Sequence, residues 1–356
     1  MDDTSLPAPR SRAATNALAA PGRGPSARTI RSTPATTDSA VRKPAAWTTR
    51  IGDTGWMPGP PLPRAVPLLL LLMASIAGCR ATPAPDELPM YDGEAGNPIA
   101  WEELVARSLA VDVVMIGEEH DDANAHALQA ALIADLLALD ARSAVSLEML
   151  ERDEQSDLDA WLRDEIETAE MVERTGASSW RGWDDFYQPV LDIAKSSGVP
   201  VVAANAPRSY VRRARLEGYD VLRALPEEEL LLFDLPETLD QGPYWERFRD
   251  LMLEYREDEV EVEEIRRTFS SQMVWDATMG ASVASALDRP EVDRVIHLLG
   301  RFHGDFEGGT IRELRRLRPE TSVLVISCVG RGDGRNLAGE DLGRAQVVVY
   351  TLKSDD

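Results

Sequence analysis

Short runs of apolar residues alternate with segments of helical periodicity, and this alternation limits the folds open to the chain more than any other feature. The runs cover residues 111–116, 144–149, 199–203, 295–299, 323–327 and 347–352. Strands that are apolar on both faces are typical of parallel sheets, because helices cover such sheets on both sides. The sequence therefore predicts an α/β fold, with a mostly parallel sheet and helices on both of its faces.

The alternation is interrupted over about residues 220–290. This stretch contains no strand-like run and is rich in Glu, Arg, Leu and Met, most of which favour helices. Toward its end, Ala277, Gly280 and Ala284 recur at helical spacing and form a side of small residues. We therefore expect a helical insertion whose last helix packs closely on that side.

Two of the four histidines follow strand-like runs in the same G-x-x-H pattern. His120 ends the stretch 117–120, and His303 ends the stretch 300–303, about 180 residues later. In open α/β sheets, ligands bind in the crevice outside the carboxyl ends of the strands. The two motifs therefore predict one site at that edge of the sheet, for metal binding or for acid–base chemistry.

Three further polar residues are expected at the same edge, so that the candidate catalytic residues are His120, Glu148, His303, Glu118 and Arg208. Glu148 lies within an apolar run, where a carboxylate is costly to bury unless it is paired or bound to a metal. Simpler interpretations stay open: Glu148 could form a structural ion pair with Arg208, and Glu118 could cap the following helix.

The other two histidines are expected to have lesser parts. His126 lies in the first turns of a helix, where it could orient the site from behind or only pack. His297 lies in the middle of a strand-like run, so we expect a core histidine whose hydrogen bonds are made inside the protein.

Two histidines with a carboxylate match the ligands of many transition-metal sites. The sequence predicts that His120, Glu148 and His303 bind Zn, Mn or Co, and such a metal could activate water. One expected function is therefore a metal-dependent hydrolase that acts on a peptide or ester through the two G-x-x-H motifs. A metal-free alternative is that a histidine oriented by a carboxylate acts as a general base. No G-x-S-x-G, H-E-x-x-H or P-loop motif occurs, which argues against the familiar serine hydrolase, zincin and nucleotide-binding schemes. Whether the protein is an enzyme stays open.

The first 98 residues are expected to lie outside the α/β domain of residues 99–356. Residues 1–56 are rich in Ala, Pro, Ser, Thr and Arg, so they are expected to be disordered, or to reflect a start codon placed upstream of Met57. Residues 57–78 have the pattern of a secretory signal, with an apolar run too short to span a bilayer. Residues 79–98 are rich in Pro and Gly and are expected to be a tether.

The signal ends in small residues followed by Cys79, which resembles a bacterial lipobox. This predicts a lipid-modified Cys79 and an exported protein anchored at the periplasmic or outer-membrane face of a bacterial membrane. The alternative is an ordinary signal peptide that is cleaved nearby. The second cysteine, Cys328, lies in an apolar run and is expected to be buried.

The charge of the chain bears on its partners. It contains 61 acidic and 38 basic residues, which gives a net charge of −23. Such an acidic chain argues against nucleic acid as a partner. The expected partners are the membrane, through the lipid, and a small-molecule ligand, and a homodimer stays open.

Several motifs together resemble the ChaN-like, haem-binding-uptake branch of the Tiki superfamily. They are GEEHDD with HALQ, SLEML, WDDFYQPVL, AANAPRSYVRR, SQMVWDATMGASV and LLGRFHGDF, and the resemblance covers about Leu104–Val329. It implies an α/β fold, a lipoprotein location in some members, and a role in haem or iron acquisition. Relatives in the wider superfamily include metal-dependent proteases and erythromycin esterases.

Residue by residue, the resemblance carries over His120, Glu148 and His303 as the polar core of the superfamily. Glu118 and Arg208 match it less closely. The second motif has Phe302 where ChaN-like relatives often have a small polar residue, so a narrower cleft is expected. Haem is therefore the cofactor or ligand implied by resemblance, with a divalent metal as the alternative, and no axial haem ligand is assigned.

Overall fold

Seven strands form one sheet in a computed structural model that describes residues 83–239, 242–254, 261–332 and 334–353. The strands are β1 Met90–Asp92, β2 Val113–Glu118, β3 Ser143–Glu151, β4 Val201–Asn205, β5 Arg294–Gly300, β6 Val323–Val329 and β7 Val347–Tyr350. Their order is β1-β7-β6-β2-β5-β3-β4, and every pairing is parallel except that of β1 with β7. The predicted α/β fold with a mostly parallel sheet is confirmed.

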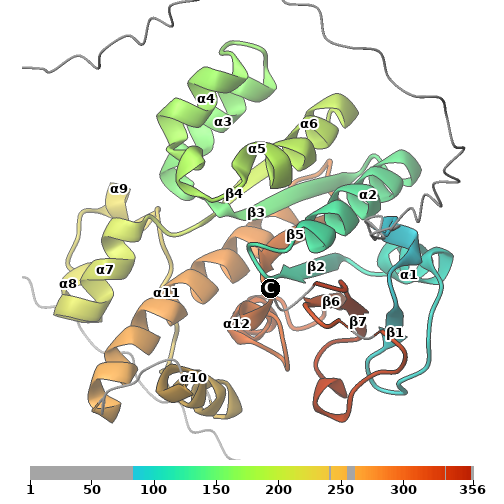
Figure 1. Cartoon of the computed structure of the whole chain (residues 1–356). Coiled ribbons are helices and arrows are strands. Elements are labelled where there is room, and N and C mark those ends of the chain that lie inside the picture. The colour runs from blue at the N-terminus through green and yellow to red at the C-terminus, as the bar shows by residue number, and fades with distance from the viewer. Residues whose placement is uncertain (1–82, 240–241, 255–260, 333, 354–356) are drawn as a thin grey trace, which may run out of the picture. The chain divides into compact units, whose positions relative to one another are not determined.

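Helices cover both faces of this sheet (Figure 1). They are α1 Trp101–Leu109, α2 Ala123–Leu139, α3 Gln155–Leu162, α4 Thr168–Thr175, α5 Trp183–Phe186, α6 Gln188–Ser197, α7 Arg208–Glu217, α8 Tyr219–Arg223, α9 Glu227–Leu230, α10 Pro243–Glu254, α11 Val262–Ala286 and α12 Gly309–Leu317. Helices α1 to α6 pack in the core cluster of one face, and α11 and α12 pack in the cluster of the other.

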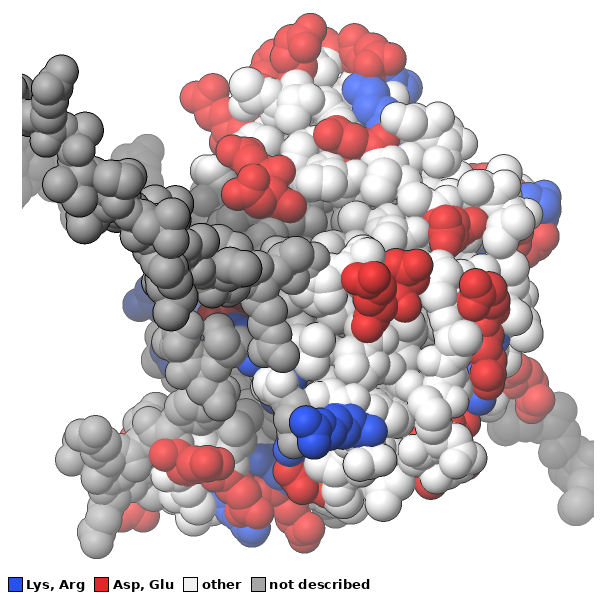
Figure 2. Space-filling view, turned by 45° about the vertical axis from the view of Figure 1, so that its right-hand side comes forward, with Lys and Arg blue, Asp and Glu red and all other residues white. Residues whose placement is uncertain are grey.

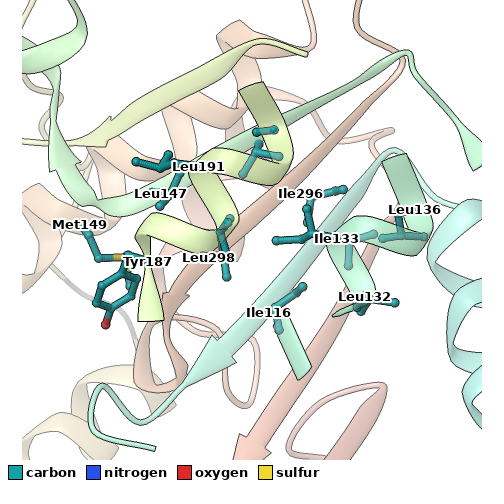
Figure 3. Packing of buried hydrophobic residues seen from close by; sticks show 14 of the residues in the cluster. Ile116, Leu132, Ile133, Leu136, Leu147, Met149, Tyr187, Leu191, Ile296 and Leu298 are labelled. Carbon is teal, nitrogen blue, oxygen red and sulfur yellow. The ribbon is translucent and has the colours of Figure 1, made fainter. Parts of the chain in front are cut away.

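The strands direct successive side chains to opposite faces, as the period of a β-strand requires. In β5, Ile296 and Leu298 join the cluster under α2 and α6, whereas Val295 and Leu299 join the cluster under α11 and α12. Figure 3 shows the first cluster, in which Ile296 and Leu298 lie among side chains of α2 and α6. Both faces are therefore buried, which explains why the strands read as continuous apolar runs.

The stretch predicted as a helical insertion contains α8, α9, α10 and α11, and its described residues include no strand. Helix α11 is nevertheless part of the main architecture, because it covers the sheet beside α12. A Cβ atom at Gly280 would lie 2.9 Å from the backbone nitrogen of Leu314 in α12. The side of small residues in the sequence is therefore the contact between these two helices.

The folded part begins earlier than residue 99. Met90–Asp92, within the segment predicted as a tether, form β1 and pair with β7 at the edge of the sheet. Met90 and Tyr91 are buried there. A strand of three residues carries too little periodicity to be recognised, and its partner β7 lies near the other end of the chain.

Two predictions about the amino-terminal part lie outside the described residues: the extension 1–56 and the signal 57–78 with Cys79. No described helix is long and apolar enough to cross a membrane. Cys328 is buried and not in a disulfide.

Candidate functional site

The carboxyl ends of the central strands meet around a small cavity. Strand β5 lies between β2 and β3, and Glu118 at the end of β2 pairs in register with Gly300 at the end of β5. The cavity has a volume of about 250 Å³. Its lining residues are His120, Glu148, Met149, Glu151, Trp180, Asn205, Arg208, Trp275 and His303. Four of the five candidate catalytic residues therefore share one cavity, and Glu118 lies outside its lining.

A larger hollow of about 740 Å³ lies at the opposite ends of the strands, next to Asp112 and Asp293. No histidine lines it. The candidate catalytic residues therefore line the smaller of these two cavities.

Glu118 binds the ring nitrogen of His120 that points away from the cavity. Nδ1 of His120 lies 3.0 Å from Oε1 of Glu118, whose side chain is fully buried. The same carboxylate accepts hydrogen bonds from the Tyr187 hydroxyl at 2.6 Å and from the Gln129 amide at 2.6 Å. Because a carboxylate only accepts, Nδ1 of His120 carries the proton of this hydrogen bond, and Nε2 is left for the cavity.

The pKa of His120 is raised. Burial lowers it, but the hydrogen bond to Glu118 and the charge of Glu148 outweigh burial. His126 reaches the same network: its Nδ1 lies 3.0 Å from Gln129 Oε1 and 3.4 Å from Glu118 Oε2. It contacts Glu118 rather than the cavity.

The glycines of the two G-x-x-H motifs let the motifs pack against each other. A Cβ atom at Gly117 would lie 2.8 Å from the α-carbon of Arg301 in the second motif. A Cβ atom at Gly300 would lie 3.1 Å from Nε2 of His120 in the first motif, and 3.6 Å from Oε2 of Glu148. The imidazole Nε2 and the Glu148 carboxylate therefore face the same space, directly over Gly300.

Glu148 is held as a carboxylate at the floor of the cavity. Its Oε2 accepts the backbone N–H of Gly300 at 2.6 Å, and its Oε1 lies 3.6 Å from Nε2 of His303. Burial raises the pKa of Glu148, but the charges of His303 and His120 and the Gly300 hydrogen bond outweigh burial, so the pKa is lowered.

The alternative of an ion pair between Glu148 and Arg208 is not what the structure shows. Arg208 lies at the rim, where its Nε is 3.4 Å from Glu151 Oε1 and its guanidinium lies 5.2 Å from the ring centre of Trp180. The Arg208 side chain is 55 % exposed. It is therefore available to a ligand at the mouth of the cavity.

His303 is buried and held by a residue that sequence reasoning missed. Its Nδ1 donates to Oδ1 of Asp276 in α11, at 2.7 Å. Burial lowers the pKa of His303, but Asp276 and then Glu148 outweigh burial and raise it to about 9. The available signal was a lone acidic residue on the buried side of α11, three residues after Met273 and four before Gly280.

Phe302 and His297 lie away from the cavity lining. Phe302 packs against Tyr244 and Phe248, with ring centres 5.4 and 6.0 Å apart, so the expected narrowing of the cleft does not occur. His297 is buried in β5 with Nδ1 2.9 Å from the Ser146 hydroxyl, and burial lowers its pKa to about 4.

A comparison with protein-family models matches residues 104–314, more than half of the chain, to the family described as haem-binding uptake, Tiki superfamily, ChaN. The chain belongs to this family. The match spans both G-x-x-H motifs, Glu148, Arg208 and Asp276. No curated protein matches the chain.

Three solved structures resemble the chain to different degrees. The structure titled "Cofacial heme binding to ChaN of Campylobacter jejuni" is 19 % identical, with a TM-score of 0.59 over 74 % of this chain and 96 % of that one. The type III effector HopBA1 is 14 % identical, with a TM-score of 0.45 over 76 % of this chain and 99 % of that one. A mutant of the erythromycin esterase EreC, in its open conformation, is 18 % identical, with a TM-score of 0.38 over 70 % of this chain and 78 % of that one. Only the ChaN likeness is close enough to support the fold.

The predicted metal site of this ChaN-like chain is not supported. In the part of the chain that the structure describes, no group of three or more His, Cys, Asp or Glu side chains is arranged to hold a metal ion. In the site as it stands, His120 and His303 each use Nδ1 on a carboxylate, and Glu148 accepts the Gly300 N–H.

Haem fits the mouth of the cavity better than its interior. Pockets that enclose drug-sized ligands have volumes of about 300–1,000 Å³, and the cavity, at about 250 Å³, is too small to enclose a porphyrin. The mouth presents the imidazole of His120, the indole of Trp180 and the guanidinium of Arg208. Aromatic and cationic groups of this kind suit the flat apolar ring and the propionates of haem.

On the face shown in Figure 2, acidic side chains are spread widely and basic ones are few. This agrees with the net charge of −23.

Proposed function

We propose that the protein binds haem across the mouth of the cavity and takes part in haem uptake. The observation that carries this proposal is the family match over residues 104–314. The geometry supports it through Trp180, whose indole lies edge-on to His120 at 5.2 Å and beneath the guanidinium of Arg208. The porphyrin would lie against these groups, and Arg208 would pair with a propionate.

The test is a titration of the purified protein with haemin, followed by the Soret band. We expect saturation at one haem per chain or per dimer, with the oligomeric state measured on the same sample by sedimentation. The Trp180→Ala and Arg208→Ala variants should bind haemin more weakly. Arg213→Ala is the matched control, because Arg213 lies on the same helix, pairs with Glu217 and does not line the cavity. A flat titration of the unchanged protein at micromolar haemin would refute the proposal.

We propose further that the protein is exported and anchored to a bacterial membrane through lipid on Cys79. The sequence pattern of residues 57–79 supports this. Because β1 begins at Met90, the ten residues 80–89 separate the anchor from the sheet. Such a segment spans at most about 35 Å, so the domain would stay close to the membrane. Metabolic labelling with a fatty acid should mark the native protein but not Cys79→Ala, and equal labelling of both would exclude this anchor.

A metal-free hydrolase is the second candidate. The observation in its favour is that Glu118 leaves Nε2 of His120 facing the space over Gly300, beside Glu148, which is the arrangement of a general base. A panel of small esters and amides tests it, with His120→Ala as the inactive variant and His297→Gln as a histidine variant outside the cavity lining. Turnover that is unchanged in His120→Ala, or absent in the unchanged protein, would count against this candidate.

A further inference from the structure

Asp276 is a fully buried carboxylate in the middle of α11, and the fold makes room for it. Oδ1 accepts hydrogen bonds from Nδ1 of His303 at 2.7 Å and from the Thr310 hydroxyl at 2.8 Å. Oδ2 accepts one from the Tyr244 hydroxyl at 2.8 Å. A Cβ atom at Gly309 would lie 2.2 Å from Oδ2, so α12 can begin there only with glycine. A buried charge is costly unless it is paired and hydrogen-bonded, and this one meets both conditions.

The imidazole of His303 lies between this carboxylate and a second one. Nδ1 is bonded to Asp276, and Nε2 lies 3.6 Å from Oε1 of Glu148, which is too long for a hydrogen bond. The ring lies between two carboxylates and is therefore stabilised as an imidazolium, with a proton on each nitrogen. Because Glu148 is too distant to accept it, the Nε2–H remains available to a ligand atom in the cavity that His303 lines.

The remaining groups around His303 are the side-chain amide of Gln272 and two histidines. The side-chain amide of Gln272 lies within 3.3 Å of both ring nitrogens. The same amide nitrogen donates to the Tyr244 hydroxyl at 3.1 Å, which in turn donates to Asp276. His120 acts on this region electrostatically and opposes a positive charge on His303, whereas burial lowers the pKa of His297 to about 4, so His297 is neutral at neutral pH. The carboxylates of Asp276 and Glu148 therefore have to outweigh burial and the charge of His120.

We propose that Asp276 is a positioning residue of the cavity, which holds the His303 imidazolium so that Nε2–H donates to an oxygen atom of the bound ligand. The identity of that ligand rests on the proposed function. For haem, the porphyrin is too large for the cavity, so the oxygen would belong to a propionate that enters from the mouth. Arg208 at the rim and His303 at the floor would then bind the same carboxylate group.

Asp276→Asn removes the charge and keeps the shape. Tyr244→Phe is the matched control, since it removes one hydrogen bond to the same carboxylate and keeps its charge. The chain has four histidines, so long-range ¹H–¹⁵N spectra can resolve each ring and report its protonation. In the unchanged protein and in Tyr244→Phe, His303 should be doubly protonated at neutral pH. In Asp276→Asn its titration midpoint should fall by about 1–3 pH units.

The ligand part of the proposal is tested with haemin on the same variants. Binding should weaken at least about tenfold in Asp276→Asn, a change equivalent to roughly 1.4 kcal/mol, and should be nearly unchanged in Tyr244→Phe. A His303 that is neutral in the unchanged protein, or equal haemin affinity in Asp276→Asn, would overturn the proposal. If Asp276→Asn does not fold, the spectrum of the unchanged protein still decides the protonation of His303. Failure of haem binding in the unchanged protein would instead refute the proposed function, and the spectra would show this separately.

Discussion

The protein should lose stability as the pH rises from about 6.5 to about 9, because of His303. The pKa of this buried imidazole rises from the ordinary value of 6.5 to about 9 in the folded protein, since Asp276 and Glu148 outweigh the effect of burial. A group whose pKa is higher in the folded state stabilises the fold fully below its unfolded pKa. That stabilisation is lost as the pH rises through the folded pKa. At about 1.4 kcal/mol per unit of pKa, the loss amounts to roughly 3 kcal/mol.

The assay is urea unfolding at a series of pH values from 6 to 9.5, for the unchanged protein and for His303→Gln. The variant will be less stable at pH 6, because it leaves Asp276 and Glu148 buried without the His303 cation. The quantity to compare is therefore the slope of the free energy of unfolding against pH. His297→Gln is the control: the pKa of His297 is lowered from 6.5 to about 4 in the folded protein, so this histidine is nearly neutral in both states above about pH 7.5 and should not make the slope shallower.

The free energy of unfolding should fall more steeply with pH in the unchanged protein than in His303→Gln. Equal slopes for these two proteins between pH 7 and 9 would refute the reasoning, since His303 would then have an ordinary pKa in the folded protein. A shallower slope in His297→Gln would also contradict it, because the effect would then belong to the wrong histidine.

Three further changes test the packing of the sheet and of the site. Gly300→Ala places a methyl group 3.1 Å from Nε2 of His120. Haemin binding should therefore weaken by several-fold (about 1 kcal/mol), while the free energy of unfolding stays nearly unchanged. Gly339→Ala is the control, because its methyl group meets no atom within 4 Å and should leave haemin binding as it is. Gln155→Ala removes an amide that hydrogen-bonds both a carbonyl and an N–H of the edge strand β4, and should lower the free energy of unfolding by about 1–3 kcal/mol in urea titrations. Leu298→Ala leaves a cavity in the core under α2 and α6 and should cost about 2–5 kcal/mol by the same measurement, and a smaller cost would mean that the core collapses around it.

Much of the fold followed from local patterns. Runs such as 111–116 and 295–299 are apolar on both faces, and that pattern is itself the consequence of helices on both sides of the sheet. The stretch 90–92 was missed because three residues carry no usable period, and its strand exists only by pairing with β7. The role of α11 as a covering layer was also not evident, since a helical pattern does not say what the helix packs on.

The site was predictable to the extent that it depends on strand ends. His120, Glu148, His303 and Arg208 were expected together because parallel strands bring their carboxyl ends to one edge. The metal assignment is not supported, since no group of three or more His, Cys, Asp or Glu side chains among the described residues is arranged to hold a metal ion.

The sequence by itself determined the α/β fold and the edge of the sheet at which the site lies. It did so through the alternation of strand-like and helical segments, the two G-x-x-H motifs and a glutamate within an apolar run. Only the tertiary structure decided which group each side chain binds. Asp276 and His303 are 27 residues apart, and Tyr187 and Glu118 are 69 apart. Such pairs form only when α11 and the turn before α6 pack beside the sheet. Hydrogen bonds depend on distances of a few tenths of an ångström, and those distances are set by packing rather than by spacing along the chain.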